Sequence, residues 1–145
     1  MSTSPWQTAN IMGPKVASNL KGEVAGKLIR KAKRPLMIVG MNSAKTEIAG
    51  GKLIDYAIDM GKAGVKIVAT AHMFREFANR GYRVDADMPV MNITDRLRDP
   101  DWKGIDGKGA HDLVVFLGVP YYLESQMLST LKHFAPNLTT IALDA

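Results

Sequence analysis

The chain has 145 residues and a formal net charge of +5, with 46% hydrophobic and 23% charged residues. These proportions are typical of a globular protein and exclude a disordered chain, a fibrous repeat and a coiled coil. The chain contains no cysteine, which excludes disulfides, thiolate zinc sites and iron–sulfur clusters held by its own residues. We therefore expect a cytoplasmic protein with neither a secretory signal nor a membrane span.

Positive charge is concentrated at the N-terminal end. Residues 1–35 hold seven basic side chains and one acidic side chain, Glu23, whereas the rest holds twelve basic and thirteen acidic ones. Such a segment fits a solvated helix surface, or contacts with nucleic acid, an acidic partner or a phosphorylated ligand. The solvated surface is favoured over nucleic acid, because no aromatic residue lies within the basic run for base stacking.

The first 20 residues differ from the rest of the chain. Residues 1–20 are expected to form an extended arm, because Pro5 and Pro14 interrupt helical periodicity. The arm also carries Trp6, an apolar residue that either folds back on the domain or docks on a partner. Residues 21–145 are expected to form a single α/β domain.

Helices are predicted where apolar residues recur every three or four positions, and buried strands where short apolar runs are continuous. In chain order the sequence predicts a helix over residues 23–33, a strand over 36–39, a helix over 52–62, a strand over 65–69, a helix over 72–80, a strand over 89–93, a polar loop over 94–110, a strand over 113–117, a helix over 121–135 and a strand over 139–143. Strands alternating with helices indicate βαβ units. The predicted fold is a Rossmann-like three-layer sandwich with a parallel sheet.

Three loops follow predicted strands at the edge where open parallel sheets bind ligands. Glycine lets the backbone approach a ligand, and helix N-termini offer N–H groups to anions. The need to turn a strand into a helix explains these glycines slightly better than ligand binding does. The candidate cofactor-binding residues are Gly40, Asn42 and Ser43 in the first loop, Thr70 and His72 in the second, and Gly118 and Tyr121 in the third.

Specific nucleotide, metal and catalytic motifs are missing from the sequence. The run GMNSAKT at residues 40–46 lacks the second glycine of a phosphate loop, and no G-x-G-x-x-G follows the first strand. His72 and Glu76 lie four apart on a helix, but no third metal ligand is evident and such pairs are usually surface contacts. We therefore expect no catalytic residues and no metal in this chain.

Several stretches nevertheless resemble known families. Residues 32–40, AKRPLMIVG, are similar to the opening of the central domain of thiamine-diphosphate enzymes, and so to sirtuin- and deoxyhypusine-synthase-like domains that bind NAD or FAD. A closer resemblance, over nearly the whole chain, is to the epsilon subunits of archaeal acetyl-CoA decarbonylase/synthase complexes. The stretches that carry it are PWQTANI and GPK in the arm, RKAKRP before the first strand, HMFREF at residues 72–77 and HDLVVFLG at residues 111–118.

This resemblance implies a role in a carbon monoxide dehydrogenase complex that reversibly cleaves and makes acetyl-CoA, in methane formation from acetate or in carbon fixation. In that family two alpha subunits, which carry the nickel–iron–sulfur centre, associate with two epsilon subunits. Epsilon is taken to stabilise alpha, or to pass electrons to FAD. The resemblance therefore implies a non-catalytic accessory subunit, and the absence of cysteine agrees with this division of labour.

The alternative is a flavin- or dinucleotide-binding electron-transfer module that uses the seven loop residues, with Arg34 attracting phosphate if the fold brings it near. Nucleic-acid binding ranks below both hypotheses, and no membrane partner is expected. For the accessory subunit, the candidate contact residues are Trp6 and the exposed aromatic candidates Tyr121, Tyr122 and Trp102. Each of them fits a core or loop-anchoring role equally well.

Overall fold

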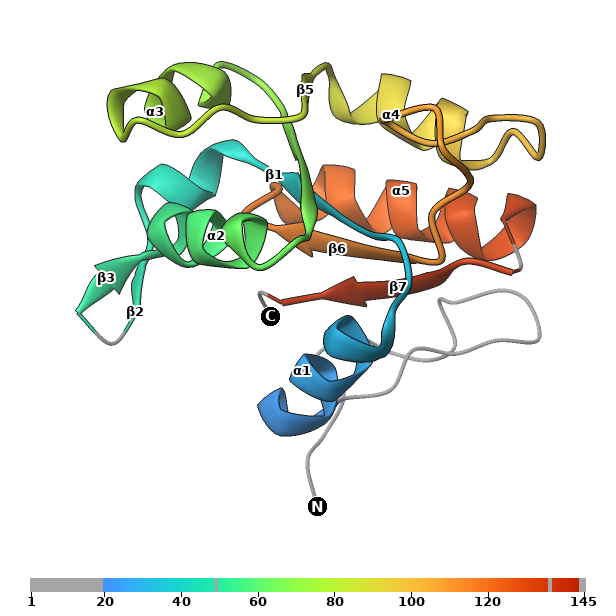
Figure 1. Ribbon diagram of the computed structural model, residues 1–145, viewed down its shortest axis with the longest axis horizontal. Helices are drawn as coiled ribbons and strands as arrows, with labels where there is room; N and C mark the ends of the chain where they lie inside the picture. The colour runs from blue at the N-terminus through green and yellow to red at the C-terminus, as the bar shows by residue number, and fades with distance from the viewer. Residues whose placement is uncertain (1–19, 49, 136, 144–145) are drawn as a thin grey trace.

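The computed structural model describes residues 20–48, 50–135 and 137–143. Its centre is a five-stranded sheet in which all neighbouring strands are parallel (Figure 1). In spatial order the strands are β5 (Ala86–Asp87), β4 (Lys66–Ala69), β1 (Pro35–Val39), β6 (Leu113–Leu117) and β7 (Thr139–Ala142). A short antiparallel hairpin, β2 (Glu47–Ile48) and β3 (Gly51–Lys52), forms a separate sheet.

Helices cover both faces of this sheet (Figure 1). The helices are α1 (Gly22–Lys31), the 3₁₀-helix η2 (Met41–Ala44), α2 (Leu53–Lys62), α3 (Met73–Asn79), α4 (Val90–Leu97) and α5 (Tyr121–Phe134). Side chains of α1, α2 and α3 pack against one face, and those of α4 and α5 pack against the other. The predicted parallel α/β architecture is confirmed, in a layout compatible with a Rossmann-like fold.

The central strands are buried on both faces, as their continuous apolar runs predict. In β1, Met37 and Val39 belong to the core beneath α2, whereas Leu36 and Ile38 belong to the core beneath α5. All five residues of β6 are buried in the same alternating manner. Because β1 lies between β4 and β6, the loops that follow these three strands emerge side by side.

The predicted strand over residues 89–93 is wrong. Residues 90–97 form helix α4, and the strand in this region is the two-residue β5 before it. Val90 and Ile93 are buried three positions apart, which is helical rather than strand spacing. Pro89 lies at the N-cap of the helix, a position where its missing N–H costs nothing.

The other predicted helices and strands are confirmed with small shifts at their ends. The expected arm over residues 1–20, including Trp6, lies outside the described residues except for Leu20. Within the part of the chain that the structure describes, no helix is both long enough and apolar enough to cross a membrane.

Candidate functional site

The seven candidate cofactor-binding residues all lie at the carboxyl edge of the sheet, because the strands that precede them are parallel neighbours. β1 leads into η2, β4 into α3, and β6 into α5. This is also the place where the chain reverses direction across the sheet, since β4 and β6 flank β1 on opposite sides. In open α/β sheets such a switch point is the usual ligand crevice.

The crevice between the β1 and β6 loops is closed by direct backbone contact. The Gly40 N–H donates to the Leu117 carbonyl at 2.8 Å, and the Asn42 N–H donates to the Gly118 carbonyl at 2.9 Å. A Cβ atom added at Gly40 would lie 2.5 Å from both the Gly118 oxygen and the Val119 Cα. The glycines therefore let the two loops approach each other rather than a ligand.

Two buried hydroxyls tie the ends of the strands together, one between β1 and β6 and one between β1 and β4. Ser43 Oγ donates to the Leu117 carbonyl at 3.1 Å, and Thr70 Oγ1 donates to the Val39 carbonyl at 2.9 Å. Neither hydroxyl points its hydrogen at an open space. As the loops stand, the residues between β1 and β6 do not fit the pyrophosphate of a dinucleotide, because both the space and the donors are already occupied.

The other three candidates, Asn42, His72 and Tyr121, are exposed. His72 is the N-cap residue of α3 and makes no capping hydrogen bond with its side chain. Glu76, four residues on, pairs with Arg80 instead, with 3.3 Å between the Arg80 Nη1 and Glu76 Oε2 atoms. Glu76 is therefore engaged in a surface ion pair with Arg80 rather than with His72.

Five large apolar side chains project from the same edge, and we call them the carboxyl-edge patch. Each is the first or second residue of the helix that follows a strand of the sheet, and each is 40–71% exposed. The patch consists of Met41 on η2, Phe74 on α3, Met91 on α4, and Tyr121 and Tyr122 on α5. Four neighbouring strands, which lie about 15 Å apart from first to last, precede these helices.

The composition of the carboxyl-edge patch matches that of protein interfaces. Interface cores are enriched in tyrosine, phenylalanine and methionine and are depleted of charge. Tyr121 and Tyr122 were predicted as exposed aromatic residues, and the structure confirms their exposure. Sequence reasoning missed Met41, Phe74 and Met91: Phe74 was predicted to face the core but is 40% exposed, and only Met41 lies in a loop directly after a predicted strand.

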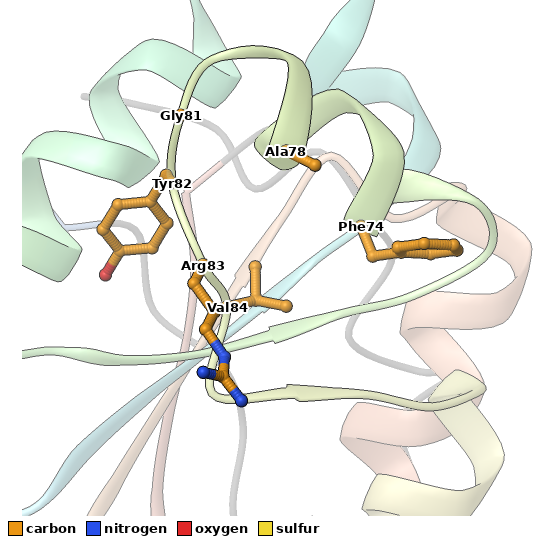
Figure 2. Close-up of a pocket in the computed structure, with 6 residues that line it drawn as sticks. All are labelled: Phe74, Ala78, Gly81, Tyr82, Arg83 and Val84. Atoms are coloured by element: carbon orange, nitrogen blue, oxygen red, sulfur yellow. The ribbon is translucent and has the colours of Figure 1, made fainter.

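A shallow apolar depression of about 340 Å³ adjoins Phe74. Figure 2 shows Phe74 of α3 on one side and Tyr82 on the other, with Ala78 and Val84 between them. The Tyr82 ring lies over Gly61 of α2, where an added Cβ would lie 2.2 Å from the hydroxyl. A surface of this kind suits an inserted apolar side chain better than a cofactor, which needs several convergent polar groups.

The opposite, amino edge of the sheet holds a network of charged residues. Both carboxylate oxygens of Asp112 accept backbone N–H bonds, from Lys33 and from Arg34, at 2.8 Å each. The Arg34 guanidinium pairs with Asp106, and its Nε atom donates to the Gly109 carbonyl at 3.0 Å. The fold does not bring Arg34 near the carboxyl ends of the strands, as phosphate attraction there would require, because Arg34 lies at the other end of β1, a strand length of about 16 Å away.

His111 completes this amino-edge network. Its Nε2 accepts the Ile105 N–H at 3.1 Å, so the proton lies on Nδ1, which donates to the Arg34 carbonyl at 3.0 Å. Its ring also contacts Trp102, with 5.6 Å between ring centroids. Trp102 is therefore a half-buried anchor of the loop and not the exposed contact residue that was expected.

The environment shifts the pKa values of three groups in this network. Desolvation lowers the pKa of His111, with its hydrogen bond to the Arg34 carbonyl opposing the shift. The hydrogen bond from the Arg34 side chain, with that from the Lys108 N–H, lowers the pKa of Asp106 to about 2. Desolvation raises the pKa of Asp112, but the N–H bonds from Lys33 and Arg34 outweigh it and lower the pKa.

Comparisons with known proteins identify the family. The model of the CO dehydrogenase beta subunit/acetyl-CoA synthase epsilon subunit family matches residues 1–145. An acetyl-CoA decarbonylase/synthase complex subunit epsilon from Methanothrix soehngenii is 41% identical, over 97% of this chain and 73% of its own length. That from Methanothermobacter thermautotrophicus is 39% identical, over 96% of this chain and 78% of its own length. The chain belongs to the CO dehydrogenase beta subunit/acetyl-CoA synthase epsilon subunit family.

Proposed function

We propose that this chain is a non-catalytic accessory subunit of an acetyl-CoA decarbonylase/synthase complex. In this role it binds and stabilises the nickel–iron carbon monoxide dehydrogenase alpha subunit, with two alpha and two epsilon chains in the assembly. The relatives' names, which describe subunits of such a complex, support an accessory role. The complex would serve methane formation from acetate or carbon fixation.

The carboxyl-edge patch is the observation that carries this proposal. Five large uncharged side chains are exposed where sheets of this kind usually bind a ligand, while the crevice between the β1 and β6 loops is closed. Exposed apolar surface of this sort is unfavourable in water and favours burial against another protein. We infer that the alpha subunit covers this patch and that the tyrosines provide much of the binding energy.

A binding measurement with purified alpha subunit tests the proposal. The variant Tyr121→Ser/Tyr122→Ser should raise the Kd for alpha at least about 30-fold, because truncating even one tyrosine at an interface centre costs about 2 kcal/mol. The matched control is Phe134→Ser at the other end of α5, where the side chain is 62% exposed. This control should change the Kd less than about threefold.

The measurement has clear outcomes against the proposal. If the unaltered chain does not bind alpha, the accessory role is wrong. If alpha binds but the tyrosine variant and the Phe134→Ser control behave alike, the carboxyl-edge patch is not the contact surface. Circular dichroism should show that all three proteins have the same helix content.

We also propose that the chain assists electron transfer to FAD, a role that rests on the family resemblance alone. Titration of FAD with the isolated chain, followed by flavin fluorescence, addresses it. The closed contact between Gly40 and Gly118 predicts no quenching by the isolated chain. Quenching that His72→Ala abolishes would support the flavin-binding alternative, because His72 is an exposed candidate residue whose replacement leaves the loop contact intact.

A further inference from the structure

Helix α1 carries more apolar surface than the sheet covers. Ala25 is buried and Ile29 packs against the core beneath α2, so this side of the helix faces the sheet. Val24 and Leu28 lie four residues apart within α1 and therefore form a second row along the helix. The side chains of this row, which we call the α1 stripe, are 37–42% exposed.

Unpaired positive charges surround the α1 stripe. Lys27 and Lys31 lie three positions after Val24 and Leu28, so they adjoin the stripe on the helix surface. Three more exposed cations lie within the same segment, and none of the five forms an ion pair with a described residue. These three are Lys21, Arg30 and Lys33. The only acidic residue in the segment is Glu23.

We propose that α1 docks on an acidic surface with an apolar centre on the alpha subunit, as a second contact beside the carboxyl-edge patch. This inference rests on the proposed function, since it takes alpha as the partner. The stripe would be buried at the centre of the contact, and the lysines would face carboxylates at its rim. Complementary charge of this kind steers association, and its effect weakens as salt is added.

The charge and shape of α1 favour this occupant over others. A second copy of the chain would bring two sets of five cations together, and like charges repel. A nucleic-acid backbone attracts lysine but gains nothing from two aliphatic side chains, and the stripe has no aromatic residue on which a base could stack. An acidic protein surface uses both the charges and the apolar row.

The N-terminal end of α1 is the end that lies nearer the carboxyl edge of the sheet. Figure 1 shows that α1 begins on the side toward which the arrowheads of β6 and β7 point, and runs back against the direction of the strands. Its first turn is therefore on the same side of the molecule as the carboxyl edge. A helix of ten residues is about 15 Å long, which is within the span of an ordinary interface.

Association kinetics with purified alpha subunit test the proposal. The variant Lys27→Glu/Lys31→Glu should slow association about tenfold at low salt, and the difference should disappear near 0.5 M salt. The control Lys62→Glu/Lys108→Glu makes the same change in net charge at exposed lysines elsewhere and should slow association less than threefold. Val24→Ser/Leu28→Ser should instead speed dissociation about tenfold, because it removes buried apolar contact.

The outcomes separate this inference from the proposed function. Loss of alpha binding by the unaltered chain would overturn both. Normal alpha binding with equal kinetics for the α1 variants and their control would overturn only the α1 contact. Salt-dependent binding to a 20-base-pair DNA duplex that Lys27→Glu/Lys31→Glu abolishes would assign α1 to nucleic acid. A dimer in sedimentation that Val24→Ser/Leu28→Ser converts to a monomer would assign the stripe to a second copy.

Discussion

At the amino edge of the sheet, charged side chains hold the loop before β6 against the start of β1, whereas at the carboxyl edge the loops meet through their backbones. Arg34, His111 and Asp112 connect the amino-edge segments by hydrogen bonds. At the carboxyl edge, Gly40 and Gly118 have no side chains, so the two loops can pack backbone against backbone. The amino edge thus pairs its polar groups with one another, while the carboxyl edge leaves large apolar groups exposed.

The difference indicates a division of labour between the two edges. A network of paired charges is satisfied within the chain, so the amino edge has little to offer a partner. The carboxyl edge is held in shape by backbone contacts, so its outward side chains are available for binding. Substitutions at the two edges should accordingly affect different properties.

The largest effect on stability is expected at the closed carboxyl-edge crevice. In Gly118→Ala the new Cβ would lie 2.1 Å from Ser43 Oγ, and the backbone φ is +71°. Together, overlap and strain should lower the free energy of unfolding by about 3 kcal/mol or more. The control Gly107→Ala has nearly the same φ, +73°, but open space around it, and should cost about 1 kcal/mol. Urea unfolding measures both, and equal losses would contradict the close contact of the loops.

A smaller loss is expected at the amino edge. Asp112→Ala removes the acceptor for two N–H groups and should cost about 2 kcal/mol, since water partly replaces the carboxylate at this exposed position. Asp112→Asn keeps one carbonyl oxygen and should cost about half as much. Urea unfolding of both variants checks the order. A loss below about 0.5 kcal/mol for Asp112→Ala would show that the network contributes little to stability.

The smallest effect is a pH dependence from His111. Because its folded pKa lies below the ordinary value of 6.5, the unfolded chain binds the proton first as pH falls. The contribution of neutral His111 to the free energy of unfolding is complete above about pH 6.5, and it is lost as pH falls through the folded pKa of His111. His111→Gln should remove this decline, measured as urea midpoints between pH 8 and pH 5. The contribution of Asp106 begins only as pH falls below about 3.8 and so does not interfere. An unchanged decline in the variant would refute the assignment.

Sequence patterns predicted most of the fold because they report local periodicity and burial on both faces. They failed over residues 86–97, where a two-residue strand is too short to give a pattern and Pro89 fits both a strand end and a helix start. The patterns also placed all seven candidate residues on the correct edge. They could not show that Gly40 and Gly118, which are 78 positions apart, touch each other.

The sequence by itself determined the parallel α/β architecture, the edge at which the loops gather and the family, since all of these depend on patterns along the chain. Only the tertiary structure decided that the crevice is closed, that Arg34 pairs with Asp106 far from this crevice, and that Val24 and Leu28 are exposed. These are distances between residues remote in sequence. They depend on how the layers pack, and a pattern of residue types does not encode them locally.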